Sequence, residues 1–213
     1  MITHEQDELL TKLREKISDH MSGKRLRHTL GVEREIAALA AIYAPGDEYR
    51  LRTAALLHDI TKELSLEKQL QLCREFGIIY TQDETRMPKT FHARTAVEAV
   101  KRDFPEFADE MVLSAIRWHT TGRPGMSVSE NLLYLADYIE DTRTFEDCVK
   151  LRAFFYDGLA GAKDAAAREK LLNDTLILSF DMTIRNLIDE GDPIHEMTVQ
   201  ARNALICARE VEA

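Results

Sequence analysis

Apolar residues recur at helical spacing through most of this chain, and many of the apolar stretches stop at a histidine or an aspartate. Residues three or four positions apart share one face of a helix, so this pattern predicts a helical protein with its apolar stripes turned inward. A histidine or carboxylate buried on such a face is costly unless it is paired or bound to a cation. Five such residues follow apolar stretches and a sixth opens one; they are His28, His58, Asp59, His119, Asp137 and, at the opening, His92. Together they predict a metal centre, and such centres commonly serve hydrolysis.

The pattern allows the individual helices to be placed. Helices are expected over residues 5–20, 24–44, 48–60, 65–76, 92–104, 106–119, 127–141, 145–157, 165–190 and 195–210. Proline and glycine mark several of the breaks, as at Pro45-Gly46 and Gly191-Asp192-Pro193. Residues 77–90 are expected to form a polar loop and residues 158–168 a helix junction at the surface. No convincing strand pattern and no internal repeat is found, so we predict an all-α fold.

Length and composition suit one globular domain with a short appendage. The chain has 213 residues, of which 45% are hydrophobic and 31% charged, so a packed core is expected. We assign residues 1–21 to an N-terminal helical extension and residues 22–213 to the domain that carries the site. The formal net charge of −9 argues against a nucleic-acid polymer as partner, because neutralising its phosphates needs an excess of cations. A small nucleotide needs only two or three well-placed cations.

The location of the protein can be predicted from the same composition. Cys73, Cys148 and Cys207 are far apart and form no paired motif, which is typical of reduced thiols. The acidic and polar start, Met1 to Leu10, does not resemble a signal peptide. No apolar stretch approaches the roughly 18 residues that a membrane span needs. We therefore expect a cytoplasmic protein without a membrane segment.

The candidate ligands are imidazoles and carboxylates, which suit Fe, Mn, Co, Ni, Zn or Mg. His58 and Asp59 can reach one or two ions together, and Asp59 can bridge two because a carboxylate has two oxygens. Each candidate also has a structural interpretation. The pair can be a helix end with a solvent-facing carboxylate, and His28 or His119 can be a hydrogen-bonded core histidine. His92 can be a helix-start residue or a substrate contact, so its role as a metal ligand stays open.

The order of these residues resembles the H…HD…D signature of HD-domain phosphohydrolases. The closer likeness is to the YqeK-type group, the symmetrical diadenosine-tetraphosphate hydrolases of bacteria. The segments that carry the likeness are RHTLGV at 27–32, AALLHDITKE at 54–63, AIRWHTTGRP at 115–124 and LADYIE at 135–140. Arg143 and Pro193-Ile194-His195 complete the pattern, which spans about residues 22–205. The HD dipeptide alone is common, whereas HTTGRP followed by ADYIE is specific.

The resemblance implies an HD-domain helical bundle around a metal centre that holds one or two ions, with iron as the metal. The metal ligands that it implies are His28, His58, Asp59 and Asp137. The residues that it places on the nucleotide or its phosphates are His92, His119, Tyr138 and Arg143, with His28 beside them and Pro193, Ile194 and His195 closing over the base. The match therefore extends from the metal ligands to both ends of the expected substrate.

Several candidate roles come from the residues themselves. Asp59 is expected to orient the metal and to accept a proton, and Lys62, one helical turn later, to neutralise a phosphate oxygen. The alternative for Lys62 is an ordinary exposed lysine. Thr120 offers a hydroxyl beside His119, either to a phosphate or to a turn. Arg143 can grip a phosphate with two N–H groups, and its alternative is a surface ion pair with Glu140 or Asp141.

The expected reaction is attack of metal-activated water on a nucleotide polyphosphate. For diadenosine tetraphosphate the resemblance places the cut at the middle, which gives two ADP. One alternative is an HD phosphohydrolase for a nucleoside mono- or triphosphate or a cyclic nucleotide. Another is a catalytically silent HD module that binds a nucleotide; the full ligand set favours catalysis over it. The last predicted helix can pack on its own domain or on a second copy, so a homodimer stays open.

Overall fold

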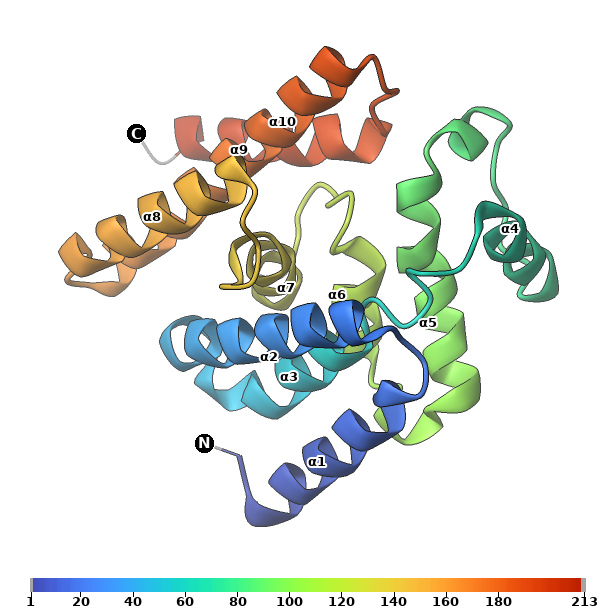
Figure 1. Cartoon of the computed structure of the whole chain (residues 1–213). Helices are drawn as coiled ribbons and strands as arrows, with labels where there is room; N and C mark the ends of the chain where they lie inside the picture. Colours follow the sequence, from blue (N-terminus) through green and yellow to red (C-terminus); the bar gives the residue numbers. More distant parts are fainter. Residues whose placement is uncertain (1, 212–213) are drawn as a thin grey trace.

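The protein is all-α, as the sequence predicts. The computed structural model describes residues 2–211, and within that range it contains helices and no strand (Figure 1). The α-helices are α1 (His4–Ser18), α2 (Gly23–Tyr43), α3 (Glu48–Leu57), α4 (Leu66–Glu75), α5 (Phe91–Asp103), α6 (Glu110–Trp118), α7 (Val128–Ile139), α8 (Glu146–Gly161), α9 (Ala165–Glu190) and α10 (Glu196–Val211). Four short 3₁₀ helices lie between them: η1 (Pro45–Asp47), η2 (Asp83–Arg86), η3 (Pro88–Thr90) and η4 (Pro105–Phe107).

Side-chain caps explain where several helices begin. Thr3 and Gln6 form a capping box at α1, and Ser127 and Glu130 form one at α7. In each box the hydroxyl accepts a hydrogen bond from a first-turn backbone N–H that has no partner within the helix. Ser22 caps α2 in the same way through the backbone N–H of Arg25. These local signals fix the starts of α1, α2 and α7, and the last two of these helices carry site residues.

The structure departs from the predicted bounds at four places. Helix α6 begins at Glu110 instead of residue 106, because Pro105 starts a 3₁₀ helix and Asp109 caps α6. The polar segment 77–90 contains η2 and η3. Helix α3 ends at Leu57, which leaves His58 as its C-terminal cap. Helix α8 continues to Gly161, and Gly158 inside it allows a close approach to the side chain of Leu171 in α9.

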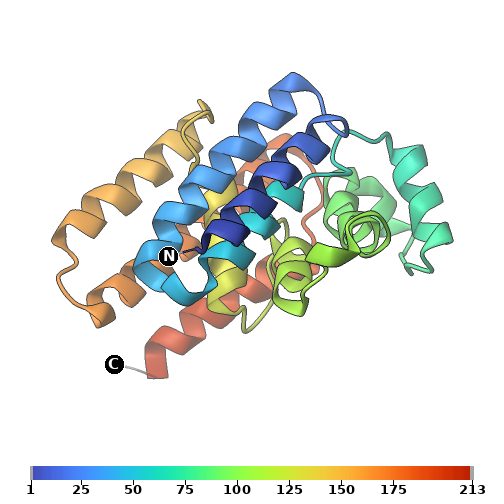
Figure 2. The ribbon, with the colours of Figure 1, turned by 90° about the horizontal axis from the view of Figure 1, so that it is seen from below.

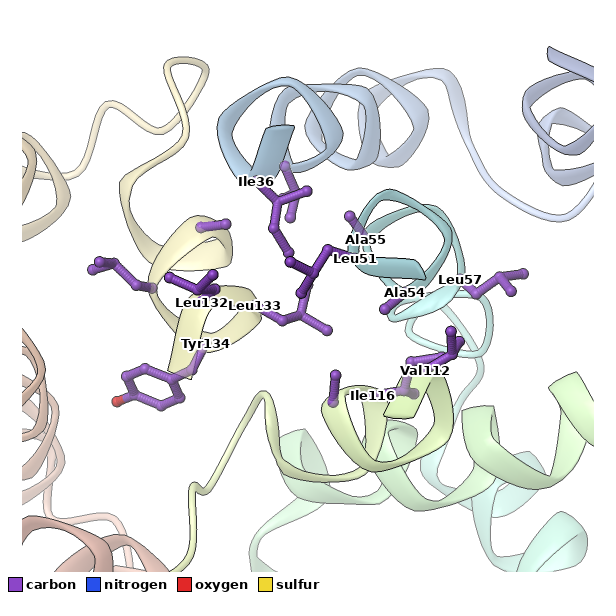
Figure 3. Packing of buried hydrophobic residues seen from close by; sticks show 14 of the residues in the cluster. Ile36, Leu51, Ala54, Ala55, Leu57, Val112, Ile116, Leu132, Leu133 and Tyr134 are labelled. Atoms are coloured by element: carbon purple, nitrogen blue, oxygen red, sulfur yellow. The ribbon is translucent and has the colours of Figure 1, made fainter. Parts of the chain in front are cut away.

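The core lies between α2, α3, α6 and α7. Ile36 of α2 meets Leu51 and Ala55 of α3, while Ile116 of α6 and Leu133 of α7 close the same apolar centre (Figure 3). All five side chains are fully buried. Burying each of them contributes about 1.5–3 kcal/mol, apart from the smaller alanine, so this contact fixes how the four helices are arranged.

Helix α1 shares this core. It lies beside α2 and over α3 (Figure 2), and its buried residues are Leu10, Leu13 and Ile17. Helix α1 therefore contributes to the same packing as the rest of the described chain, and the separation of residues 1–21 as an extension stays a prediction. None of the helices within residues 2–211 combines the length and the apolar character that crossing a lipid bilayer requires.

Helices α9 and α10 pack on each other and cover one end of α7. The ring of Tyr134 in α7 lies 4.6 Å from that of Phe180 in α9, centre to centre. Gly122, in the loop between α6 and α7, has a φ of +63° and faces Phe180 and Ala201 of α10. The last helix thus packs on its own chain, which is one of the two arrangements predicted for it; the other was packing on a second copy.

This contact predicts a difference between two glycines of the same loop. Gly122 and Gly125 both have positive φ, so alanine strains the backbone by about 1–2 kcal/mol at either position. At Gly122 the added Cβ would also lie 2.7 Å from Phe180 Cζ, whereas at Gly125 it would meet nothing within 4 Å. We expect Gly122→Ala to lose about 1–3 kcal/mol more unfolding free energy than Gly125→Ala in urea titrations. Equal losses would contradict the packing described for this loop.

Candidate metal centre

Five helices bring the six predicted residues together at one buried point. His28 lies on α2, His58 and Asp59 at the end of α3, His92 in the first turn of α5, His119 at the end of α6, and Asp137 in α7. Four of them are almost fully buried, and the side chains of His28 and Asp137 are 11% and 17% exposed. The structure brings the six residues together, and their roles as metal or substrate ligands stay predictions.

Helix ends fix the tautomers of two histidines. His58 is the cap residue of α3, and its Nδ1 lies 2.6 Å from the carbonyl oxygen of Ala55. His119 caps α6 and places Nδ1 2.6 Å from the carbonyl oxygen of Ile116. The last carbonyls of a helix have no partner within it, so they are free to accept these bonds. Since Nδ1 donates in both rings, each Nε2 keeps its lone pair directed toward the centre.

Glu140 orients the ring of His28, as the helix-end carbonyls orient those of His58 and His119. The Nδ1 atom of His28 lies 3.0 Å from Oε1 of Glu140, a carboxylate with no exposed surface. Glu140 also accepts hydrogen bonds from the backbone N–H and the hydroxyl of Thr142. Gly31 makes room for this carboxylate, because a Cβ at that position would overlap Glu140 Oε2. His28 therefore directs Nε2 at the same centre as His58 and His119.

Asp59 lies between two groups of imidazoles. Its Oδ2 is 3.4 Å from Nε2 of His58 and 3.7 Å from Nε2 of His28. Its Oδ1 is 3.1 Å from Nε2 of His92 and 3.7 Å from Nε2 of His119. A carboxylate placed in this way can contact one ion through each oxygen.

Asp137 closes the other side of the cluster. Its Oδ1 lies 3.0 Å from Nε2 of His28 and 3.8 Å from Nε2 of His58. Two groups of donors are compact enough to hold a metal ion, one made of His28, His58 and Asp137 and the other of His58, Asp59 and His119. In each group the ligand atoms lie within 4.8 Å of one another.

Unpaired polar atoms support a cation at this point. Nε2 of His28, Nε2 of His58 and Oδ1 of Asp59 are buried and have no hydrogen-bond partner. Buried polar atoms are normally paired, and each unpaired one costs about 1–3 kcal/mol. A metal ion bound to these three atoms would remove that cost. The donor set of imidazoles and carboxylates therefore fits a divalent metal ion.

The charges of the cluster also suit a cation. Burial raises the pKa of Asp59, but the charges of His58 and Lys62 outweigh it and hold that pKa well below the usual range. Burial likewise raises the pKa of Asp137, and Arg143 outweighs it, so this pKa is also low. Arg143 Nη2 lies 2.5 Å from Asp137 Oδ1, and this pair replaces the surface ion pair considered from the sequence. Both carboxylates are ionised at neutral pH.

The imidazoles differ in protonation. Burial, with Lys62 beside it, lowers the pKa of His92 to about 3. Burial also lowers the pKa of His119, so both rings are neutral at pH 7. Burial acts in the same direction on His28, but the carboxylates of Asp137 and Glu140, each 3.0 Å from one of its ring nitrogens, outweigh it and raise its pKa to about 9. This ring is therefore protonated at pH 7, and it would lose a proton on binding a metal.

Lys62, Thr120 and His92 form a polar side of the cluster. Lys62 Nζ lies 3.1 Å from Nε2 of His92 and 4.0 Å from Oδ1 of Asp59, so this lysine is turned inward. The Thr120 hydroxyl lies 3.2 Å from Nε2 of His92 and 3.1 Å from Nε2 of His119. Nε2 of His92 and Nε2 of His119 are themselves 2.9 Å apart. These contacts join Lys62 and Thr120 to the imidazoles of the cluster.

A cavity of about 300 Å³ leads away from Thr120. Helices α9 and α10 and the loops before α5 and α10 line it, and Pro193 and His195 are among its residues. Ile194 and Tyr138 are not among them; Tyr138 is half-buried and bonds to Thr183, which does line the cavity. We call this space the α9–α10 cavity.

The sequence did not point to two residues that hold the ligands. Arg25 Nη1 lies 2.6 Å from Asp59 Oδ2, and Glu140 orients His28. Arg25 precedes His28 by three residues on α2, and Glu140 follows Asp137 by three at the end of α7. Both residues could have been found in the sequence by looking for a charged residue one helical turn from each predicted ligand.

An all-α fold with this order of buried ligands defines a known class. The family model described as HD domain matches residues 25–142, and this range contains all six residues of the cluster. The match covers more than half of the chain, so the chain belongs to the HD domain family. The resemblance found in the sequence is thereby confirmed.

Its relatives narrow the class further. The symmetrical bis(5'-nucleosyl)-tetraphosphatase of Halalkalibacterium halodurans is 32% identical over 194 residues, or 89% of this chain and 93% of the relative. The protein of the same name from Bacillus subtilis is 30% identical over 94% of this chain and 97% of the relative. A crystal structure from Clostridium acetobutylicum, of a "predicted HD superfamily hydrolase involved in NAD metabolism", has a TM-score of 0.79 at 36% identity. It covers 93% of this chain and 97% of that one.

The contact between Gly31 and Glu140 predicts a sensitive position. Alanine at Gly31 would displace Glu140 from Thr142 and from His28, so we expect Gly31→Ala to lose about 1–3 kcal/mol of unfolding free energy. Gly23, in the first turn of the same helix, is the control, because a Cβ there meets nothing within 4 Å. Gly23→Ala should be neutral or stabilising by up to about 1 kcal/mol. Urea denaturation of the metal-free proteins makes the comparison, and matching midpoints would contradict the contact.

Proposed function

We propose that this protein is a metal-dependent hydrolase that cleaves diadenosine tetraphosphate symmetrically into two ADP. The observation that carries the proposal is the convergence of three Nε2 atoms on two ionised carboxylates, with three of these donors unpaired. The relatives named as symmetrical tetraphosphatases, which align over most of both chains, support the substrate and the position of the cut.

In this proposal His28, His58, Asp59 and Asp137 hold the first ion. The second oxygen of Asp59 faces His92 and His119 and can bridge to a second. Iron is the metal that we propose, because the resemblance to YqeK-type hydrolases implies it. The imidazole and carboxylate donors suit Mn, Co, Ni, Zn and Mg as well. When bound, the metal supplies a nucleophile at neutral pH by lowering the pKa of water, and it draws charge from the phosphate.

The chain's own cations complete the site. Lys62 on one side and Arg143 on the other place positive charge where a polyphosphate would approach the cluster. Fixed charges in a largely buried site stabilise the charge that develops as the phosphate bond breaks. Asp59 keeps a low pKa, so it serves mainly to hold and orient the ion, and the role of proton acceptor predicted for it is secondary.

The α9–α10 cavity is proposed to hold one nucleoside. Thr120 joins it to the cluster, while Pro193 and His195 line its far part. The lining also includes Met87, Pro88 and Leu187, which offer apolar contact to a base. His195 accepts a hydrogen bond at Nδ1 from the backbone N–H of Met197, which orients its ring at the start of α10. Ile194 and Tyr138 would support this cavity from behind.

NAD is a second candidate substrate. The structure from Clostridium acetobutylicum is described as involved in NAD metabolism. NAD and diadenosine tetraphosphate are both dinucleotides bridged by phosphates, and the ligand set alone serves either. The length of the phosphate bridge distinguishes the two substrates, because four phosphates hold the nucleosides of diadenosine tetraphosphate further apart than two phosphates hold those of NAD.

Product analysis tests the proposal. The purified, metal-analysed protein is incubated with diadenosine tetraphosphate, NAD or ATP, and the products are separated by anion exchange. We expect ADP as the sole product from diadenosine tetraphosphate, with the reaction lost on chelation and restored by metal. Formation of AMP and ATP from diadenosine tetraphosphate would contradict symmetrical cleavage. Faster turnover of NAD or ATP than of diadenosine tetraphosphate would show that the substrate is a different one.

A second prediction concerns Asp59. We expect Asp59→Ala to lose metal and turnover together, because it removes a ligand that faces both groups of imidazoles. The loss of metal affinity should exceed the roughly 10–100-fold that removal of a ligand's hydrogen-bond partner costs. Asp141→Ala is the control, since that carboxylate is exposed and pairs with Arg34 outside the cluster. Elemental analysis and circular dichroism are measured on both variants; a folded Asp59→Ala protein with normal metal content would refute the assignment.

A further inference from the structure

A second cavity borders the metal cluster on another side. It has a volume of about 400 Å³ and lies between the first turns of α2 and the segment that joins α7 to α8. Its lining residues are Lys24, Arg25, Arg27, His28, Glu140, Thr142, Arg143, Thr144 and Phe145. None of these lines the α9–α10 cavity. We call this space the α2–α8 cleft.

Both cavities lead to the same cluster through different residues. The α9–α10 cavity reaches it at Thr120, whose hydroxyl contacts His92 and His119. The α2–α8 cleft reaches it at His28 and Arg143, which both contact Asp137. The metal ligands therefore lie between two spaces, each of a size typical of small-molecule sites, roughly 300–1,000 Å³.

The cleft concentrates positive charge on an acidic protein. The chain has a net charge of −9, yet four of the nine residues that line the cleft are lysine or arginine. Arg25 and Arg143 are bound to Asp59 and Asp137. Lys24 and Arg27 are exposed and have no ion-pair partner among the residues that the structure describes. These two cations are free to bind an anionic ligand in the cleft.

The cleft also has an exposed aromatic ring. Phe145 lies just before α8, and 71% of its surface is exposed. Phe91, Phe104, Phe155 and Phe180 are by contrast fully buried. A phenylalanine exposed beside unpaired cations is the combination that binds nucleotides, in which bases stack on the ring while basic side chains contact phosphate.

We propose that the α2–α8 cleft binds the second nucleoside of a dinucleoside polyphosphate, with its base stacked on Phe145 and its phosphates near Lys24 and Arg27. The proposal rests on the proposed function and adds the residues that recognise the other half of the substrate. A substrate with two like halves, cut at its centre, must extend from the metal in two directions. The two cavities provide one space for each nucleoside, and only this cleft has an exposed aromatic ring beside two unpaired cations.

Kinetics on two substrates test the cleft. Adenosine tetraphosphate carries one nucleoside, which the apolar α9–α10 cavity accommodates, and so does not need Phe145. We expect Phe145→Ala to raise KM for diadenosine tetraphosphate by about tenfold, with less than about twofold change for adenosine tetraphosphate. Phe154→Ala is the matched control, since this phenylalanine lies within α8, is 42% exposed and is outside the cleft. An unchanged KM in Phe145→Ala, or an equal rise for both substrates, would overturn the proposal.

A binding measurement separates this proposal from the proposed function, because it needs no turnover. Phe145→Trp keeps an aromatic surface and adds a fluorophore to a chain whose one other tryptophan, Trp118, lies outside the cleft. Titration with ADP should quench the new emission in a saturable way. Adding Arg27→Ala should weaken the apparent affinity about tenfold, whereas adding Lys163→Ala, an exposed cation beyond the far end of α8, should not. Quenching no greater than in the wild type would refute the cleft even if diadenosine tetraphosphate is hydrolysed.

Discussion

The burial of two ionised carboxylates is the constraint on which the rest of this structure depends. Asp59 and Asp137 lie inside the helical core, where the penalty for an unpaired charge is several kcal/mol. Their compensation comes from Arg25 and His28 on α2, from Arg143 beyond α7, and from imidazoles at the ends of three other helices. Because these partners come from several elements, the pairing requires five helices to meet at one point. The apolar contacts among α2, α3, α6 and α7 hold them there.

Much of this arrangement could be predicted from the sequence, and the rest could not for physical reasons. Helical periodicity and capping residues give the elements, and His28, His58, Asp59, His92, His119 and Asp137 converge as predicted. The starts of α6 and the two 3₁₀ helices before α5 depend on local proline and cap geometry that periodicity does not contain. The backbone carbonyls that fix the tautomers of two histidines have no sequence signature. Cavities arise from packing between distant segments, so the exclusion of Ile194 and Tyr138 from the α9–α10 lining was not predictable.

The position of the cluster connects the fold to the proposed reaction. Helix-end carbonyls and Glu140 bind the Nδ1 atoms of three rings, so that three Nε2 atoms face a common point. Cavities lie on two sides of that point, one lined largely by α9, α10 and the loops before α5 and α10, the other by α2 and the segment before α8. A metal held there would meet the centre of a ligand whose two ends occupy the two spaces. The placement of a cavity on each side of the cluster thus suits the cleavage of a molecule with two like halves.

Anomalous diffraction from crystals of the metal-loaded protein tests the central claim most directly, because it locates the ion independently of any assay. Data collected on both sides of the iron absorption edge distinguish iron from other metals. The account predicts an iron peak about 2.0–2.3 Å from Nε2 of His28, Nε2 of His58 and carboxylate oxygens of Asp59 and Asp137. The account would be contradicted if a protein with stoichiometric metal gave no anomalous peak at the cluster, or if the peak lay elsewhere in the structure.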